Sequence, residues 1–349
     1  MFRIRHWYEL RDRSGATLGQ LDGVVAGSGR VSRSAAASVK ASAQITVRDT
    51  GQVDDWTQVR VQPWIEVNGT AWPLGVFLPD VPARAYSGTG QTVDVALLDK
   101  AAILDGDSFG VTYGVPQGTL VASAVRQIIA STGETPTGIE DDGKALATSI
   151  EAEPGDSKLS LVNDLLAAAG YFSLHTSGHG VFRADPYVEP SRRPVLAELT
   201  DQQDGVSLTG LYLPEFTAEQ DVGSVPNRVR AVSQAGEDEE AWTAEAVNDD
   251  PDSPYSFDRL GYWRTVVETD VQTTSQAALQ AYAERRLVDM SSPQETLEVE
   301  HPPYQLTIND VVRFRSARYG LDGLYTVQNQ EWPLAYDGLV QAKLRKVVG

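Results

Sequence analysis

Two segments near opposite ends of the chain carry the same order of strand-like patterns. The first, within residues 59–97, reads Val59-Arg60-Val61, then Gly75-Val76-Phe77-Leu78, Tyr86-Ser87-Gly88 and Val93-Asp94-Val95-Ala96-Leu97. The second, within residues 312–344, reads Val312-Arg313-Phe314, then Gly323-Leu324-Tyr325-Thr326-Val327, Tyr336-Asp337-Gly338 and Leu339-Val340-Gln341-Ala342-Lys343-Leu344. The spacings differ by several residues, so this is no simple tandem repeat. The pattern predicts two related small β-barrels far apart in one chain.

The composition is typical of a folded, β-rich protein of two to four domains. The chain has 349 residues, 41% of them hydrophobic, with 30 Gly and 18 Pro spread along it as turn residues. It has no Cys, which excludes disulfides, thiolate catalysis and Cys-zinc sites. The net charge of −19 argues against a surface that grips nucleic acid or anionic lipid. A solvated acidic surface explains it best, and it would also suit a surface past which DNA slides without binding.

Residues 1–110 are expected to form the first β-barrel. Between Val39 and Val47 apolar and polar residues alternate, as in a half-buried strand. Asn68-Gly69 lies between two strand-like runs and predicts a hairpin, because a type I′ turn needs positive φ at both central residues.

Residues 111–194 are expected to form an α/β domain. Apolar residues recur at helical spacing in 119–129 and again after Ser157, a residue type that caps helices. The second helix should stop at Gly170, and a hairpin within 171–183 should pack on both helices.

The second β-barrel is assigned to 195–235 and 295–349, separated by an insertion at 236–294. The insertion contains an acidic loop and a helix that begins near Ser275. From Glu237 to Asp252 the sequence holds eight acids and no base, yet it lacks the alternation and glycine of a calcium-binding loop. The predicted fold class is therefore α+β and β-rich: two similar barrels, an α/β domain and a helix-containing insertion.

No motif in the sequence carries a catalytic or metal-binding prediction. His175 and His179 are separated by a turn rather than a helix, and they lack the glutamate of the HExxH motif, so we interpret them as exposed turn histidines. Glu151 and Glu153 share a strand face, and a solvated face explains them better than an acid/base pair. We predict no enzyme activity, no catalytic residue, no metal and no cofactor.

Three tryptophans leave a carbohydrate-binding alternative open. Trp56, Trp242 and Trp263 could stack on sugar rings if they are exposed, although such residues more often fill cores or subunit contacts. The N-terminal residues lack the apolar stretch of a signal peptide, and no run approaches the ~18 apolar residues of a membrane span. We therefore expect synthesis in the cytoplasm and no insertion of this chain into a membrane.

Several short motifs occur in an order that resembles the tail-hub, or baseplate-hub, proteins of tailed bacteriophages and contractile injection systems. They are, in chain order, the hairpin within 59–78, Leu98-Asp99-Lys100, the run from Val162-Asn163-Asp164 to Gly170-Tyr171, Gly180-Val181-Phe182, Val225-Pro226-Asn227-Arg228-Val229 and Asp252-Ser253-Pro254-Tyr255-Ser256. The resemblance spans nearly the whole chain.

The resemblance implies a structural virion protein at the tail tip. It implies a homotrimer in which each subunit contributes two similar barrels, so that six barrel units form a ring. Such a ring would adapt a sixfold tail tube to a threefold fibre or spike and would line the DNA exit channel. The implied partners are the distal tail protein of the tube-side ring, the tape-measure protein and the central fibre or spike, without specific nucleic-acid binding. The alternative is a carbohydrate-binding tail module that recognises the host cell wall.

Overall fold

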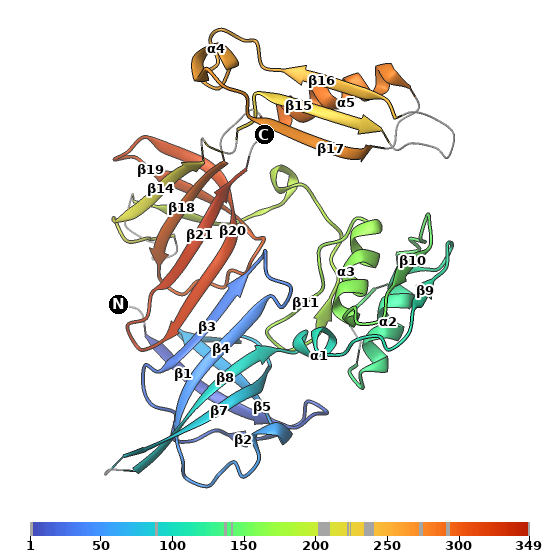
Figure 1. The fold of residues 1–349 in the computed structure, drawn as a ribbon. Coiled ribbons are helices and arrows are strands. Elements are labelled where there is room, and N and C mark those ends of the chain that lie inside the picture. Colours follow the sequence, from blue (N-terminus) through green and yellow to red (C-terminus); the bar gives the residue numbers. More distant parts are fainter. Residues whose placement is uncertain are drawn as a thin grey trace. The chain divides into compact units, whose positions relative to one another are not determined.

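The computed structural model describes residues 3–87, 90–135, 138–140, 142–201, 210–221, 223, 225–233, 241–271, 275–290 and 294–347. The chain divides into two compact units. Unit 1 comprises Met1–Phe216 and Glu298–Val347, and unit 2 comprises Thr217–Leu297. The described part is rich in strands and has few helices, as the sequence predicts (Figure 1).

Unit 1 begins with eight strands: β1 (Ile4–Arg11), β2 (Thr17–Gln20), β3 (Gly29–Ser34), β4 (Ala41–Arg48), β5 (Arg60–Val67), β6 (Thr70–Pro73), β7 (Phe77–Ser87) and β8 (Gly90–Asp99). Between them lies a short 3₁₀ turn at Trp56–Gln58. The chain later returns to this unit with β13 (Val195–Thr200), β19 (Val311–Ser316), β20 (Leu321–Leu334) and β21 (Val340–Lys346). Strands β14 (Phe216–Asp221) and β18 (Gln294–His301) carry the chain across the boundary between the units.

The hairpin predicted at Asn68-Gly69 is confirmed. Strands β5 and β6 are antiparallel neighbours, and Val67 pairs with Thr70 across the turn. Asn68 has a φ of 52° and Gly69 a φ of 91°. These positive values are what the type I′ turn requires, which is why an Asn-Gly pair marks the position.

The two segments that share one order of strand-like patterns, within 59–97 and 312–344, form the same strand arrangement. In the first, β5 pairs with β7 and β7 with β8, all antiparallel. In the second, β19 pairs with β20 and β20 with β21, again antiparallel. Each segment is therefore a meander of three antiparallel strands. In the first meander a short extra strand, β6, lies between β5 and β7 in the chain.

Strand β20 joins the two meanders in one sheet. Its first half, as far as Thr326, pairs with β19, and its second half, from Asn329 to Leu334, pairs with β3. Strand β3 pairs with β4, and β4 pairs with β8. The C-terminal strands consequently share a core with the N-terminal ones. This core contains Trp332 and Val340 together with Ile45, Phe77 and Val95.

The pairing in unit 1 forms a single path rather than two separate rings. Among the described strands the order is β14-β18-β21-β20-β3-β4-β8-β7-β5-β1-β2. Off this path, β19 pairs with β20 and with β13, and β6 pairs with β5. Closure of either meander into a barrel therefore stays a prediction. The β-rich α+β class is confirmed.

A smaller helical region follows β8 within unit 1. Its elements are α1 (Ala102–Asp105), β9 (Tyr113–Val115), α2 (Val121–Ser131), β10 (Ile150–Ala152), α3 (Lys158–Ala168), β11 (His175–Thr176) and β12 (Phe182–Arg183). The Ser157 side chain accepts a hydrogen bond from the Ser160 amide, so it caps α3 as predicted. The apolar faces of α2 and α3 pack in a core of their own, which includes Val125, Leu165 and Phe182. We call this part the α/β region.

Unit 2 is a three-stranded sheet with one long helix. Its elements are β15 (Arg228–Ser233), β16 (Thr243–Val247), α4 (Phe257–Leu260), β17 (Thr265–Val271) and α5 (Gln276–Asp289), and its sheet order is β16-β15-β17. Ser275 caps α5 by accepting a hydrogen bond from the Ala278 amide. Leu279 and Ala283 of α5 pack on Val229 and Ala231 of β15.

The sequence analysis assigns 228–233 to the second barrel, whereas the structure places this strand at the centre of the unit 2 sheet. The insertion is therefore longer than 236–294. The reason is that an alternating pattern identifies a strand with one buried face but does not identify the strand's partners. Residues 237–240 of the predicted acidic loop lie outside the described residues.

Replacing Trp332 tests the shared core. This side chain is 1% exposed and lies in the half of β20 that pairs with β3. We expect Trp332→Ala to reduce the free energy of unfolding by about 3–5 kcal/mol, because it leaves a large cavity. Denaturant unfolding followed by circular dichroism measures the loss. The control is Tyr86→Ser at a residue of the same unit that is 76% exposed, where we expect less than about 0.5 kcal/mol. Equal effects of the two variants would contradict the shared core.

Candidate functional site

The two histidines of the HTSGH segment have different partners. His175 contacts Asp185, with 3.2 Å between Nε2 and Oδ2, whereas the His179 ring packs edge-on against Trp64. His175 is half-buried, so only His179 fits the interpretation as an exposed histidine. Among the described residues no group of three or more His, Asp and Glu side chains is arranged to hold a metal ion.

Glu151 and Glu153 lie at and just after the short strand β10, and both are exposed. Within the described part of the chain neither carboxylate has an ion-pair partner among the salt bridges found. A solvated strand end explains them, as the sequence analysis favours.

The three tryptophans occupy different environments. Trp56 is 6% exposed and belongs to the core of unit 1. Trp263 is 41% exposed, but Phe257 stacks on its ring at 4.3 Å and the Arg228 guanidinium lies 4.6 Å from its centroid. Trp242 is 39% exposed. Core packing therefore explains Trp56, and contacts within unit 2 already cover much of Trp263.

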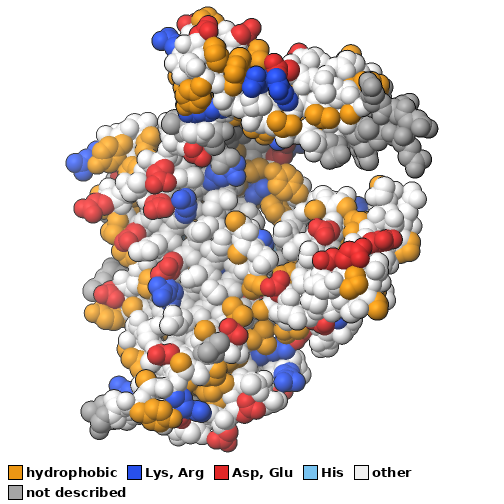
Figure 2. Space-filling view, viewed as in Figure 1, with side chains coloured by type: hydrophobic (Ala, Val, Ile, Leu, Met, Phe, Trp, Pro, Cys, Tyr) orange, Lys and Arg blue, Asp and Glu red, His pale blue; other side chains and the backbone are white. Residues whose placement is uncertain are grey.

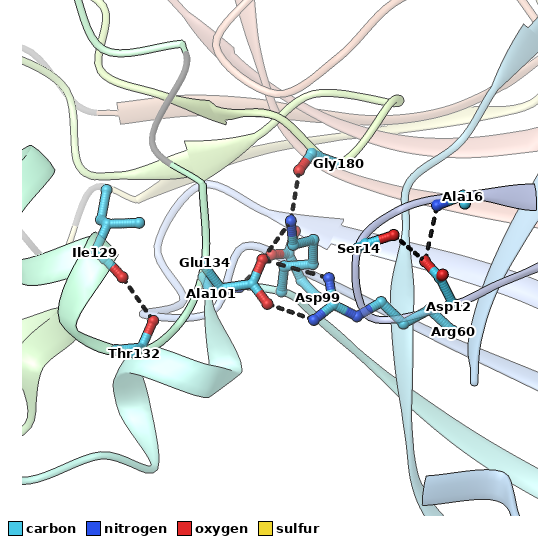
Figure 3. Close-up of polar contacts among 11 residues, drawn as sticks. Asp12, Ser14, Ala16, Arg60, Asp99, Ala101, Ile129, Thr132, Glu134 and Gly180 are labelled. Carbon is cyan, nitrogen blue, oxygen red and sulfur yellow. Dashed lines mark hydrogen bonds and ion pairs between the residues drawn. The ribbon is translucent and has the colours of Figure 1, made fainter. Parts of the chain in front are cut away.

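The most developed polar cluster is a junction between the first sheet and the α/β region (Figure 3). Glu134, which follows α2, forms ion pairs with Arg60 of β5 and with Lys100, which follows β8. The Lys100 Nζ lies 2.6 Å from Glu134 Oε2, and Arg60 donates hydrogen bonds to both carboxylate oxygens. All three side chains are at most 11% exposed. The single negative charge of Glu134 thus compensates part of the positive charge of two buried side chains, Arg60 and Lys100.

Burial and hydrogen bonding oppose each other at Glu134. Burial alone would raise the pKa of its carboxyl, but the hydrogen bonds and charges of Arg60 and Lys100 outweigh it and hold the pKa below its usual value. Asp99 shows the opposite balance, because burial raises the pKa of its carboxyl. Asp99 still accepts hydrogen bonds from the Ala101 amide and the Thr176 hydroxyl, both at 2.7 Å.

The turn between β11 and β12 inserts against the first sheet. Gln62 donates a hydrogen bond to the Gly178 carbonyl at 2.9 Å, and Lys100 donates one to the Gly180 carbonyl at 3.1 Å. A Cβ on Gly178 would lie 2.3 Å from the Pro73 carbonyl oxygen, so only glycine fits there. The HTSGH segment is therefore a turn that docks on the first sheet, and Gly178 is the residue that this close approach requires.

The junction joins the first sheet to the α/β region through ion pairs and hydrogen bonds. Both of its carboxylates are already paired or hydrogen-bonded by side chains and amides of the same chain. The sequence analysis missed it because Arg60, Lys100 and Glu134 come from three separate segments. The available signal was the Asp99-Lys100 pair at the end of a strand.

Three solved structures of tail proteins are similar to this chain over nearly its whole length. The tail protein from Neisseria meningitidis MC58 matches with a TM-score of 0.67 and 13% identity, over 98% of this chain and 96% of that chain. The 43 kDa tail protein of prophage MuSo2 from Shewanella oneidensis matches with a TM-score of 0.64 and 13% identity, over 97% and 98%. Prophage tail protein gp18 from Listeria monocytogenes EGD-e matches with a TM-score of 0.54 and 12% identity, over 97% and 94%. No family model and no curated protein sequence matches.

The chain has the fold of phage tail proteins. The resemblance inferred from the order of short motifs is confirmed at the level of the fold. At these identities the likeness concerns the fold, and the role of this chain rests on further argument.

Replacing Glu134 tests the junction. Glu134→Gln removes the charge that compensates Arg60 and Lys100, both of which are buried. We expect the free energy of unfolding to fall by about 3–5 kcal/mol at pH 7. The matched control is Glu331→Gln, which breaks the exposed pair with Arg30 and should cost less than about 1 kcal/mol. Denaturant titration compares the two, and equal losses would contradict a structural role for the junction.

The same variant has a predictable pH dependence. The pKa of Glu134 is lowered in the folded protein, so its contribution is present above the usual glutamate pKa of about 4.3 and is lost as the pH falls through the folded pKa. The stability difference between wild type and Glu134→Gln should therefore shrink below pH 4. A difference that grows as the pH falls would show that the sign is wrong.

Proposed function

We propose that this chain is a structural virion protein, the hub at the tip of a phage-type tail, and that it works as a homotrimer. The observation that carries the proposal is the tail-protein fold over nearly the whole chain, combined with the two meanders. Two similar meanders in each of three subunits give six similar units in one ring. A ring of this kind meets a sixfold tail tube on one face and a threefold fibre or spike on the other.

In this proposal residues 1–110 form the first barrel unit. Residues 195–216 and 298–347 form the second, 111–194 the α/β region and 217–297 the insertion. The division of the chain at Phe216 and Glu298 supports these limits. The partners would be the distal tail protein of the tube-side ring, the tape-measure protein and the central fibre or spike. The site of action would be the virion tail tip after synthesis in the host cytoplasm, and we assign no catalytic residue.

One face of the unit 1 sheet suits the wall of a DNA channel. The strand registers place the following side chains on the face opposite the core: Ser32, Gln44, Thr46, Asp94, Gln341, Arg30, Glu331 and Lys343. Both cations in this set are paired, Arg30 with Glu331 at 2.9 Å and Lys343 with Glu298 at 3.3 Å.

The same face also carries the exposed Arg48 and Arg345. The net charge of −19 nonetheless repels DNA at long range. On the side of the molecule drawn in Figure 2, acidic and basic side chains are interspersed rather than gathered in a basic stripe. These observations support passage of DNA without specific binding. In the described part of the chain, no helix is both long and apolar enough to span a membrane.

The carbohydrate-binding alternative has less support. Trp56 is buried, and the Trp263 ring is already contacted by Phe257 and Arg228. A sugar platform needs an open aromatic face, and Trp242, which is 39% exposed, is the tryptophan of the three that could still provide one.

Light scattering of the purified chain tests the trimer. We expect a mass about three times the 37.8 kDa of the chain, and we expect it to persist in 1 M salt if apolar surface holds the subunits together. The absence of cysteine removes disulfide-linked oligomers as an explanation. A monomer at all concentrations, or a dimer, would count against the hub.

A further inference from the structure

Four charged side chains of unit 1 meet where the first sheet, the second meander and the segment after the α/β region come together. Asp99 ends β8, and Arg33 lies in β3. Asp310 directly precedes β19, and Arg193 lies two residues before β13. The charge of Arg33 acts on both carboxylates, and the charge of Arg193 acts on Asp310. We call these four side chains the charge cluster.

The two arginines of the charge cluster donate hydrogen bonds to backbone carbonyls. Arg33 donates from Nη2 to the Leu74 carbonyl at 2.7 Å. Arg193 donates from Nε to the Val188 carbonyl at 2.6 Å and from Nη1 to the Asn309 carbonyl at 2.9 Å. Among the described residues no salt bridge joins either arginine to a carboxylate of the cluster. The two acids therefore lie near positive charge without forming contact ion pairs.

The two carboxylates of the charge cluster are held by backbone amides and by one hydroxyl group. Asp99 is 4% exposed and accepts its hydrogen bonds from the Ala101 amide and the Thr176 hydroxyl. Asp310 is half-buried and accepts one from the Thr307 amide at 2.7 Å. Withdrawing a carboxylate from water without a contact ion pair disfavours its ionised form. The surroundings of both acids therefore favour proton uptake.

Burial outweighs the nearby charges at both carboxylates. Burial raises the pKa of Asp99, although the charges of Arg33 and of His175 in β11 favour its ionised form. Burial also raises the pKa of Asp310, against the attraction of Arg33 and Arg193. These are the charged groups that act on the two carboxyls among the described residues. Each acid thus reduces the stability of the folded protein when it is ionised.

We infer that the charge cluster is an acid-responsive lock, in which proton uptake by Asp99 and Asp310 stabilises the packing of the first sheet against the α/β region and the second meander. Asp99 joins the end of β8 to β11 through Thr176, and Asp310 shapes the turn that leads into β19. A neutral carboxyl group keeps these hydrogen bonds and no longer holds a charge away from water. The lock lies within one chain and does not depend on the oligomeric state of the protein.

The sign of the pH dependence follows from the raised pKa values. Both carboxyls have an ordinary pKa of 3.8 and a higher one in the folded protein. The folded protein therefore binds these protons more tightly than the unfolded chain, and stability increases as the pH falls through the folded pKa values. The net charge of −19 adds a general pH effect, so the lock is measured as a difference between wild type and variants.

Thermal unfolding of the full-length chain, followed by circular dichroism between pH 7 and pH 4, tests the lock with Asp99→Asn and Asp310→Asn. Asparagine has the shape of a neutral carboxyl group and keeps a carbonyl oxygen for the amide donors. At pH 7 we expect each variant to unfold at least about 2 °C above wild type. This difference should shrink as the pH is lowered, because the wild-type carboxyls then become neutral themselves.

The matched control is Asp201→Asn. Asp201 is exposed, and the hydrogen bond that it accepts from the Ser316 hydroxyl lowers the pKa of its carboxyl. The ionised form of Asp201 therefore contributes to stability at neutral pH. Asp201→Asn should unfold below wild type at pH 7, which is the opposite sign.

Carbon-13 NMR of wild-type protein labelled at its aspartate carboxyl groups gives a second measurement, which needs no variant to fold. We expect two carboxyl signals with midpoints above 3.8 that are missing from Asp99→Asn and Asp310→Asn respectively. The inference would be overturned if both variants unfolded below wild type at pH 7. It would also be overturned if their difference from wild type stayed constant with pH, or if no aspartate titrated above 3.8.

Discussion

The pairing of β20 with β3 is the constraint on which the architecture of unit 1 depends. It connects strands that lie about three hundred residues apart in the chain and places Trp332 in the same core as Ile45. A shift of the pairing by one residue would turn Trp332 out to solvent, so the register is strongly specified. Because this register is fixed, the second meander continues the sheet of the first.

The polar junction around Glu134 fixes the position of the α/β region on the first sheet, as the pairing of β20 with β3 fixes the second meander. This region has its own core, separate from the core of the first sheet. A buried carboxylate between two buried cations is costly in any arrangement except the one that pairs them. Together with the close approach of Gly178 to Pro73, the ion pairs of Glu134 select one docking geometry. These contacts favour one position of the α/β region on the first sheet.

Local features of the fold could be predicted from the sequence, and distant pairings could not. Asn68-Gly69, Ser157 and Ser275 act through neighbouring backbone groups, so their roles are visible in a few residues. The partner of a strand depends on chain entropy and on packing across the whole domain, which is why 228–233 was assigned to the wrong sheet. The junction was missed for the same reason, because no local pattern links Glu134 to Arg60. The similarity of the two meanders could be predicted because the strands of each meander are close together in the sequence.

The central claim is that two similar halves of one chain, repeated by threefold symmetry, present six similar positions to a sixfold partner. Electron cryomicroscopy of the purified oligomer in end-on view tests this claim most directly. The account predicts a ring with an open or plugged centre, which appears nearly sixfold at low resolution and becomes threefold once the hairpins β7–β8 and β20–β21 are distinguished. A compact particle without a ring, or a ring whose two halves show no similarity at any resolution, would contradict it.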